Sequence, residues 1–443
     1  MKKIVSLALL LIVATGISNL HAIALFDRFT GMSINAFTAR ELSMGSVGVV
    51  SGAGPLIALR NPATLGLLHN KVGVEFSANI MKNDEDRAYP IFNSFDSYID
   101  DAVYVSNAHV FDNYVGGIFY NWQLTENIKL ATAMNFAPFY DFQFKYKEEM
   151  RTNENTDSDN EPEKIANNTL EGDGTIFAYA PAVALTLQYP EKLISSFSVG
   201  VGVAFLDGDS ERDSTIIFTQ WAKKRMQGTQ DSLEDIRYHI DTKYSGIAPQ
   251  AGFIVRLGER TNLGFAYTHK AEMSCDYRAS GDSVWKDTTI YYPPKFGIGF
   301  EYHPRNVWDT KFTIEAMLVK WSEYNSMYED VVEYAGGLEH IIPHTSIPIR
   351  LGFRYQPSGI DKSITMTTFS AGTSIPLPYN LALDLGGAIG KRNYHTPDLF
   401  PDGYYAHESL WDTNYNELPV DRANLDKVKD TMINFLATLT WRF

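Results

Sequence analysis

The sequence is poor in features that mark several large protein classes. It contains a single cysteine, Cys275, so no disulfide can form within the chain. After residue 24, no stretch approaches the ~20 consecutive apolar residues that a membrane-spanning helix needs, which excludes helical membrane spans. The net charge of −15 argues against a nucleic-acid partner. Aromatic residues are plentiful, by contrast, and make up 13% of the chain.

Motifs of catalysis and cofactor binding are also missing. No metal-ligand spacing and no phosphate-binding loop appears. A hydrolase built on a barrel wall would need a nucleophile close to a histidine, and neither His269 nor His340 has a recognisable nucleophile motif nearby. We therefore expect no metal, no cofactor and no enzymatic activity.

The amino terminus has the pattern of a secretory signal peptide. Lys2 and Lys3 form the positive region, and residues 4–13 form an apolar stretch that is too short to span a membrane. A small-x-small site follows at residues 22–24. We expect residues 1–24 to be a signal peptide that is cleaved after Ala24.

The last twelve residues alternate between an apolar and a polar face. Ile433, Phe435, Trp441 and Phe443 share the apolar face, as in a strand of a transmembrane β-barrel. A half-buried strand of a soluble protein would alternate in the same way. The aromatic carboxyl-terminal residue is typical of the signal that the outer-membrane barrel assembly machinery reads, and we assign that role to Trp441 and Phe443.

Alternating segments recur along the whole chain and predict fourteen strands. They are 72–81, 114–122, 128–146, 177–189, 193–205, 247–257, 263–277, 292–302, 312–321, 332–341, 347–355, 364–375, 381–389 and 432–443. Short connections alternate with long polar stretches at 82–112, 148–174, 207–244 and 391–431. This alternation indicates an all-β, fourteen-stranded antiparallel transmembrane barrel spanning 71–443. A periplasmic sandwich or propeller does not readily explain the one-sided loop lengths. We expect the long loops outside the cell and the carboxyl terminus in the periplasm.

The third segment, 128–146, is interrupted by Pro138. Proline cannot donate to the strand ladder, so it indicates a bend or bulge in the wall. Continued alternation would keep Tyr140 and Tyr146 on the lipid face together with Phe136.

The polar faces of the strands predict which charges point into the lumen. That set contains Glu75, Lys129, Asp141, Lys145, Arg256, Lys270, Lys295, Glu301, Glu315, Glu339, Arg350, Arg354, Asp384 and Arg442. Both signs are present, which favours charge pairing across strands or clamping of a plug over an ion-selective pore. Arg350 and Arg354 are candidates for such a clamp or for binding the carboxylate of a ligand.

Residues 25–70 do not alternate and are rich in glycine and small residues, which permit tight turns and close packing. A fourteen-stranded barrel leaves room for such a segment in its lumen. We expect 25–70 to form a hatch that plugs the barrel, although a short periplasmic tail is an alternative.

The run ARELSMGSVGVVSGAGPLIALRNPATLGLL, which contains Asn61, Pro62 and Ala63, resembles the amino-terminal hatch of the FadL-type outer-membrane transporters of hydrophobic compounds (the OMPP1/FadL/TodX type). The sequence departs from that family at Thr64, where glycine is usual. The runs IRLGFRYQPS and WSEY, which begin at Ile349 and Trp321, are also similar to family motifs. The PorV-like barrels of a secretion apparatus are relatives of the same family.

The resemblance implies a fourteen-stranded barrel with a lumenal hatch, in the outer membrane of a Gram-negative bacterium. It implies passive uptake of hydrophobic compounds such as long-chain fatty acids, with a moving hatch and a lateral opening in the wall, for which Pro138 is our candidate. A PorV-like role in protein secretion or surface assembly, and a simple porin, are the alternatives. The expected partners of this monomer are a hydrophobic ligand, outer-membrane lipid and the barrel assembly machinery.

Overall fold

The structure is a computed structural model. It describes residues 27–443 except 153–162, 190–192, 228–232, 306–308, 346, 401–409 and 411–424. The expected signal peptide, 1–24, lies outside the described residues. In the described part of the chain, no helix has the length and apolar character needed to cross a membrane.

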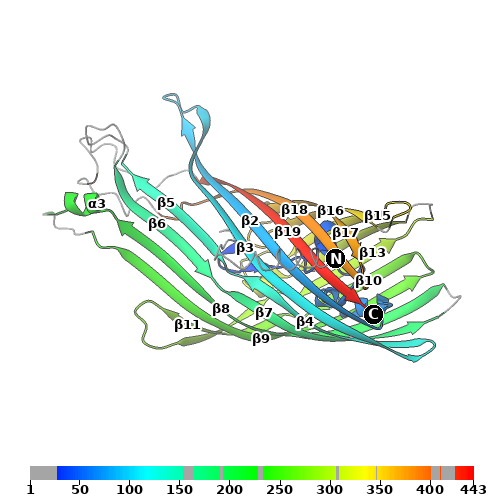
Figure 1. The fold of residues 1–443 in the computed structure, drawn as a ribbon. Coiled ribbons are helices and arrows are strands. Elements are labelled where there is room, and N and C mark those ends of the chain that lie inside the picture. Colours follow the sequence, from blue (N-terminus) through cyan, green and yellow to red (C-terminus); the bar gives the residue numbers. More distant parts are fainter. Residues whose placement is uncertain are drawn as a thin grey trace.

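The chain forms a closed antiparallel barrel of fourteen wall strands (Figure 1), as the sequence predicts. Four of these wall strands are interrupted, and each of the four carries two labels. The wall consists of β2 (Val72–Phe92), β3 (Tyr98–Thr125), β4 (Ile128–Asp141) with β5 (Phe144–Arg151), β6 (Lys164–Asp173) with β7 (Thr175–Gln188), β8 (Ile194–Phe218), β9 (Ile236–Leu257), β10 (Thr261–Thr268) with β11 (Ala271–Ala279), β12 (Lys286–Tyr292) with β13 (Lys295–Tyr302), β14 (Thr310–Val319), β15 (Val331–Ile341), β16 (Pro348–Pro357), β17 (Thr365–Leu377), β18 (Leu381–Thr396) and β19 (Asp426–Arg442).

The first and last wall strands close the barrel. β19 pairs with β2 from Arg442 opposite Gly73 to Lys427 opposite Ala88. The backbone N–H of Phe443 donates to the carbonyl of Val72 at 2.9 Å, so the pairing continues to the last residue. At the end of the barrel that contains Phe443, every wall strand is paired on both sides, so the wall has no free edge there.

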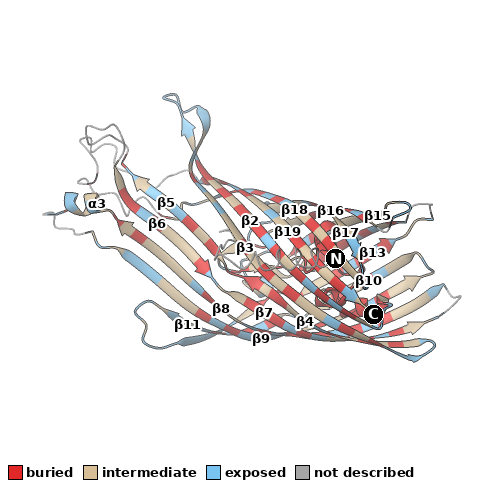
Figure 2. Ribbon diagram, viewed as in Figure 1, coloured by how far each residue is buried: buried red, intermediate tan, exposed pale blue. Residues whose placement is uncertain are grey.

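The outer surface carries the apolar faces that the alternation predicts. Val74, Phe76 and Ile80 of β2 are exposed on the outside, and so are Phe435 and Trp441 of β19. Between them, inward-facing residues of the same strands are buried, which gives the banded pattern of Figure 2. An apolar band with a polar interior is the arrangement of a transmembrane barrel.

Three of the four stretches predicted to be long loops are mostly strand, which corrects the prediction. β2 and β3 extend through 82–112 up to a five-residue turn, β5 and β6 occupy much of 148–174, and β8 and β9 occupy much of 207–244. These extensions project beyond the apolar band, where the outer face meets water. A strand there needs no apolar outer face, so its sequence lacks the alternation on which the prediction relied.

The wall is irregular where β3 and β4 separate. Their ladder ends at Gly116 opposite Phe136. Beyond that point β3 keeps its pairing with β2, whereas Tyr140 and Asp141 at the end of β4 pair with the short strand β1 (Met32–Ser33). On its other side, the ladder of β4 with β7 shifts register between Pro138 and Tyr140.

This shift reverses the faces of the strand and overturns one prediction. Tyr140 and Tyr146, which alternation places toward lipid, are buried inside the barrel with exposed fractions of 1% and 0%. Lys145, predicted to face inward, instead pairs with Glu171 at 2.6 Å, and both side chains are partly exposed. An extra residue in one strand moves all following side chains to the opposite face.

Residues 27–70, called here the amino-terminal segment, lie inside the barrel. After β1, the segment forms α2 (Ala39–Ser43) and two 3-10 helices, η2 (Pro55–Leu59) and η3 (Pro62–Leu67). Outside this segment, the short helices are α3 (Gln220–Arg225) and η4 (Trp321–Glu323), both in connections between wall strands.

Candidate functional site in the barrel lumen

The Asn-Pro-Ala motif fixes the turn at the start of η3. Asn61 is the N-cap, and its side-chain oxygen accepts a hydrogen bond from the backbone N–H of Ala63, while Pro62 occupies the first helical position. The Asn61 amide also donates to the carbonyls of Val49 at 2.6 Å and of Phe265 in β10 at 3.2 Å. The motif therefore joins two parts of the segment to the wall.

Glycines in the wall make room for this motif. A Cβ atom added to Gly252 in β9 would lie 2.0 Å from Oδ1 of Asn61, and one added to Gly200 in β8 would lie 2.3 Å from the backbone nitrogen of Ala63. Inward glycines of seven further strands likewise touch the segment, namely Gly117, Gly264, Gly297, Gly337, Gly352, Gly372 and Gly386. The segment thus rests against a ring of positions that lack side chains.

The helix α2 begins with a capping box. The Thr38 hydroxyl accepts from the backbone N–H of Glu41, and the Glu41 carboxylate accepts from the N–H groups of Thr38 and Phe37. Burial raises the pKa of Glu41 to about 7.

Wall side chains supply hydrogen bonds to the backbone of the segment. The Glu315 carboxylate in β14 accepts from the N–H groups of Gly48, Val49 and Val50 at 2.7–3.3 Å. On the other side of the barrel, the Lys129 ammonium in β4 donates to two carbonyls of the segment at 2.6 Å. These charged groups satisfy backbone groups that would otherwise be buried without partners.

The two arginines singled out from the sequence are occupied by carboxylates of the wall. Arg350 in β16 pairs with Glu339 at 2.7 Å and with Asp384 at 2.6 Å. Glu339 also accepts from both Nε and Nη2 of Arg40 in α2. The network therefore links the wall strands β15, β16 and β18 to the amino-terminal segment.

Arg354, further along the same strand, makes a similar connection. Its guanidinium pairs with Glu333 of β15 and donates to Oδ1 of Asn35 in the segment at 3.1 Å. Arg354 lines a cavity of about 140 Å³ between the segment and the inner faces of β15–β19. Arg392, which also lines it, pairs with Asp430 and Asp27.

A second cavity, which we call the chamber, lies between the segment and the opposite wall. It measures about 50 Å³, and its lining includes Phe37 and Leu59 of the segment and Pro138 and Phe139 of β4. The chamber therefore adjoins the wall where β3 and β4 separate.

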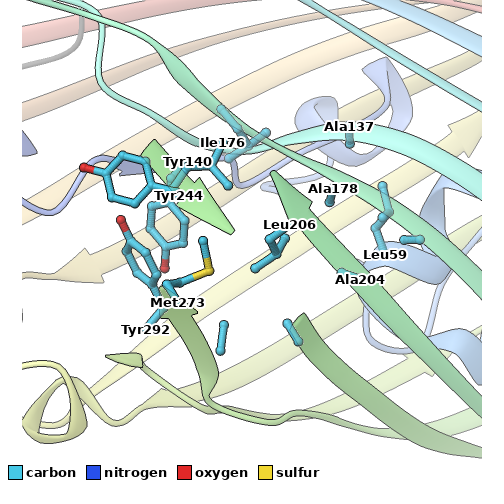
Figure 3. Close-up of a cluster of buried hydrophobic side chains, with 14 of the residues drawn as sticks. Leu59, Ala137, Tyr140, Ile176, Ala178, Ala204, Leu206, Tyr244, Met273 and Tyr292 are labelled. Atoms are coloured by element: carbon cyan, nitrogen blue, oxygen red, sulfur yellow. The ribbon is translucent and has the colours of Figure 1, made fainter. Parts of the chain in front are cut away.

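The chamber borders a cluster of buried apolar side chains from seven wall strands and the amino-terminal segment (Figure 3). Tyr140 and Tyr292 stack there with ring centroids 4.0 Å apart, and Tyr244 lies close to them with its ring parallel to Phe142. The surroundings of the chamber are thus apolar and aromatic.

Two cations line the chamber, and in the described part of the chain no carboxylate lies within ion-pair distance of either. Nζ of Lys295 in β13 contacts Oγ of Ser33 at 3.2 Å, and within the described residues it makes no ion pair. Arg60 donates to the carbonyl of Ser46, and its Nε is buried without a hydrogen-bond partner in the described part of the chain. A largely apolar cavity lined by two cations is suited to an amphipathic anion.

The remaining predicted positions lie at the barrel seam. The Trp441 indole donates to the carbonyl of Tyr379, and its ring lies 4.1 Å from that of Phe443. Sequence reasoning named neither the glycine ring nor the chamber. No local signal identifies either, because each depends on which strands face each other across the lumen.

Comparisons with known proteins bear on the fold. Protein-family models gave no match, and the search of curated proteins found no significant similarity. The toluene transporter TbuX of Ralstonia pickettii has a similar structure, with a TM-score of 0.56 and 13% identity over 92% of this chain and 99% of that one. A FadL homologue of Pseudomonas aeruginosa has a TM-score of 0.55 and 10% identity, over 93% of this chain and 100% of that one. The toluene transporter TodX of Pseudomonas putida has a TM-score of 0.52 and 13% identity, over 93% of this chain and 99% of that one.

The chain therefore has the FadL-like barrel fold that its sequence resembles. The closed barrel and its apolar outer band indicate a protein of the Gram-negative outer membrane.

Proposed function

We propose that this protein is a channel for passive uptake of hydrophobic compounds across the outer membrane. The observation that carries the proposal is the chamber, which is enclosed between the amino-terminal segment and the aromatic wall and adjoins the break between β3 and β4. The names of TbuX and TodX, both toluene transporters, give independent support.

In the proposed orientation, the extended strands and long connections face the outside of the cell. The short turns, Trp441 and Phe443 lie on the periplasmic side, where the barrel assembly machinery would read the terminal strand. The protein works as a monomer, since the lumen of one barrel contains both the segment and the chamber.

The amino-terminal segment acts as the hatch, and Arg350 and Arg354 serve as its clamp rather than as ligand-binding groups. Their pairing with wall carboxylates supports this role, because a guanidinium already engaged by Glu339 or Glu333 has less capacity for a ligand. The lateral opening forms next to Pro138, where β1 of the segment now occupies the edge that β4 would otherwise present to β3.

The ligand is a hydrophobic acid, such as a long-chain fatty acid. Lys295 and Arg60 would bind its carboxylate, and the aromatic side of the chamber would contact the chain. A neutral hydrocarbon would make no charged hydrogen bond with either cation, so the two cations favour an acid over a hydrocarbon.

A reversible cross-link tests whether the segment must move. Met32 and Asp141 are direct partners in the β1–β4 ladder, so cysteines at these two positions can form a disulfide. In a Cys275→Ser background, we expect oxidation of the Met32→Cys/Asp141→Cys variant to reduce uptake of labelled oleate by cells about tenfold, because the link holds β1 on the edge of β4.

The reduced form of the same variant is the matched control and should regain uptake. Equal uptake by the oxidised and reduced forms would contradict the moving hatch. Secretion of a surface protein that depends on this barrel, with no oleate uptake in either form, would favour the PorV-like alternative.

A further inference from the structure

The hairpin formed by the ends of β2 and β3 stands apart from the other strand ends at the same end of the barrel (Figure 1). Phe92, near the end of β2, lies twelve residues past Ile80, the last apolar residue of the outer band on that strand. At ~3.3 Å per residue and a tilt of ~40°, this places the tip roughly 30 Å above the band.

The tip is apolar and fully solvent-facing. Five large apolar side chains surround it, and their exposed fractions range from 39% to 85%. They are Ile91 and Phe92 in β2, Phe95 in the turn, and Tyr98 and Ile99 in β3. Figure 2 shows the end of this hairpin as exposed. Exposed apolar clusters of this kind mark interaction sites.

This apolar tip is separate from the membrane band. Lys82, Asp84 and Asp86 follow Ile80 in β2, and Lys82 pairs with Asp84 at 2.7 Å. A charged zone therefore lies between the band and the tip, so the membrane that holds the barrel does not cover the tip.

The turn itself is ordered. The side-chain Oδ1 of Asn93 accepts hydrogen bonds from the backbone N–H groups of Phe95 and Ser97 at 2.9 and 3.0 Å. The backbone N–H of Asn93 donates to the carbonyl of Ser97. Phe95 is thus presented at the apex by a closed turn rather than by a loose loop.

Charge restricts the partner. Residues 88–108 contain Asp96, Asp100 and Asp101 but no lysine or arginine. Asp101 is paired with Lys427 at 2.6 Å, which leaves two carboxylates beside the apolar side chains. An anionic lipid surface would be repelled, whereas a zwitterionic surface would accept aromatic side chains at its interface.

Size argues against a protein partner. The exposed area of five such side chains is on the order of 500 Å², whereas a stable protein interface takes about 800 Å² from each partner. A lipid surface requires no such minimum area and accepts a narrow apolar tip from any side.

We propose that this tip docks onto a neutral phospholipid surface opposite the membrane in which the barrel resides. Phe95, Tyr98 and Ile99 enter the interface of that surface, and the carboxylates of Asp96 and Asp100 limit the depth. The docking requires no transport through the lumen and would hold the outer mouth of the barrel beside a source of lipid.

Flotation tests the docking. The full-length protein in nanodiscs is mixed with phosphatidylcholine vesicles, and the fraction that floats with the vesicles is measured. We expect the unaltered protein to co-float, and Phe95→Ser/Ile99→Ser to reduce the bound fraction at least fivefold. Val284→Ser, at another exposed apolar position outside the hairpin, should leave it unchanged.

A probe at the apex reports on the same event locally. Ser94→Cys in a Cys275→Ser background, labelled with a polarity-sensitive dye, should shift its emission to the blue when the vesicles are added. Heat-resistant migration on gels confirms that each variant is folded.

Three results would overturn the proposal. The first is flotation of Phe95→Ser/Ile99→Ser equal to that of the unaltered protein, and the second is stronger binding to phosphatidylglycerol vesicles than to phosphatidylcholine. The third is pairing of nanodiscs without vesicles that the double substitution abolishes, which would make a second copy the partner.

Discussion

The lumen has two unlike sides, and the contrast between them shows which contacts of the amino-terminal segment are directional and which a ligand can replace. On the side formed by β14–β18, charged residues such as Glu315, Glu339 and Arg350 bind the segment or one another. On the side formed by β4–β13, aromatic residues such as Tyr140 and Tyr292 surround the chamber. Charged groups in pairs fix position through directional bonds, whereas apolar contacts are non-directional and leave room for a ligand to replace them.

The largest effect is expected from a side chain added at one of the wall glycines against which the amino-terminal segment packs. Gly252→Val places a side chain where Oδ1 of Asn61 now lies, so the segment should be displaced from the lumen. We expect single-channel conductance in planar bilayers to rise to that of a variant lacking residues 27–68.

Gly116→Val is the matched control, because a Cβ there meets only one backbone atom, at 3.9 Å. Its conductance should match that of the unaltered protein. A closed Gly252→Val barrel with normal folding would mean that the segment does not plug the lumen.

An intermediate effect is expected from loss of a charged residue on the side of the lumen formed by β14–β18. Glu315→Ala removes the acceptor for the N–H groups of Gly48, Val49 and Val50. The loss should weaken local docking by about 3 kcal/mol, which corresponds to a rise of about 100-fold in the amide exchange rates of those residues.

Glu301→Ala serves as the comparison, since this buried carboxylate of β13 binds Asn262 of the wall and not the segment. Hydrogen exchange followed by mass spectrometry distinguishes the two. Equal exchange at Gly48–Val50 in both variants would show that Glu315 does not hold the segment.

The smallest effect is expected from a substitution in the chamber, on the side of the lumen formed by β4–β13. Lys295→Met should weaken oleate binding about tenfold, or about 1.4 kcal/mol, and leave binding of toluene unchanged, because only the acid needs the ammonium group. Lys295→Arg should keep most of the affinity. Titration calorimetry measures both ligands, and an equal loss for toluene would assign Lys295 a packing role.

Much of the barrel was predictable because the residue pattern of each wall strand reflects whether lipid, water or protein lies against each of its faces. Where lipid covers one face, alternation marks the strand, as in Val72–Phe92 up to Ile80 and in the last strand. The same strands continue beyond the band, where both faces tolerate polar residues, and there the sequence resembles a loop. Pro138 indicated a bulge, but the aromatic residues after it were assigned to the wrong face, because the size of the register shift is set by pairing with β7 and not by the local sequence.

By itself, the sequence determined the barrel, its strand number and the inward charges such as Glu315 and Arg350. Each of these follows from local periodicity. Only the tertiary structure decided that Gly252 faces Asn61, that Tyr140 points inward and that Lys295 lines the chamber. Closure of the sheet fixes these contacts between residues far apart in the chain, because the register of each strand depends on its neighbours around the whole barrel.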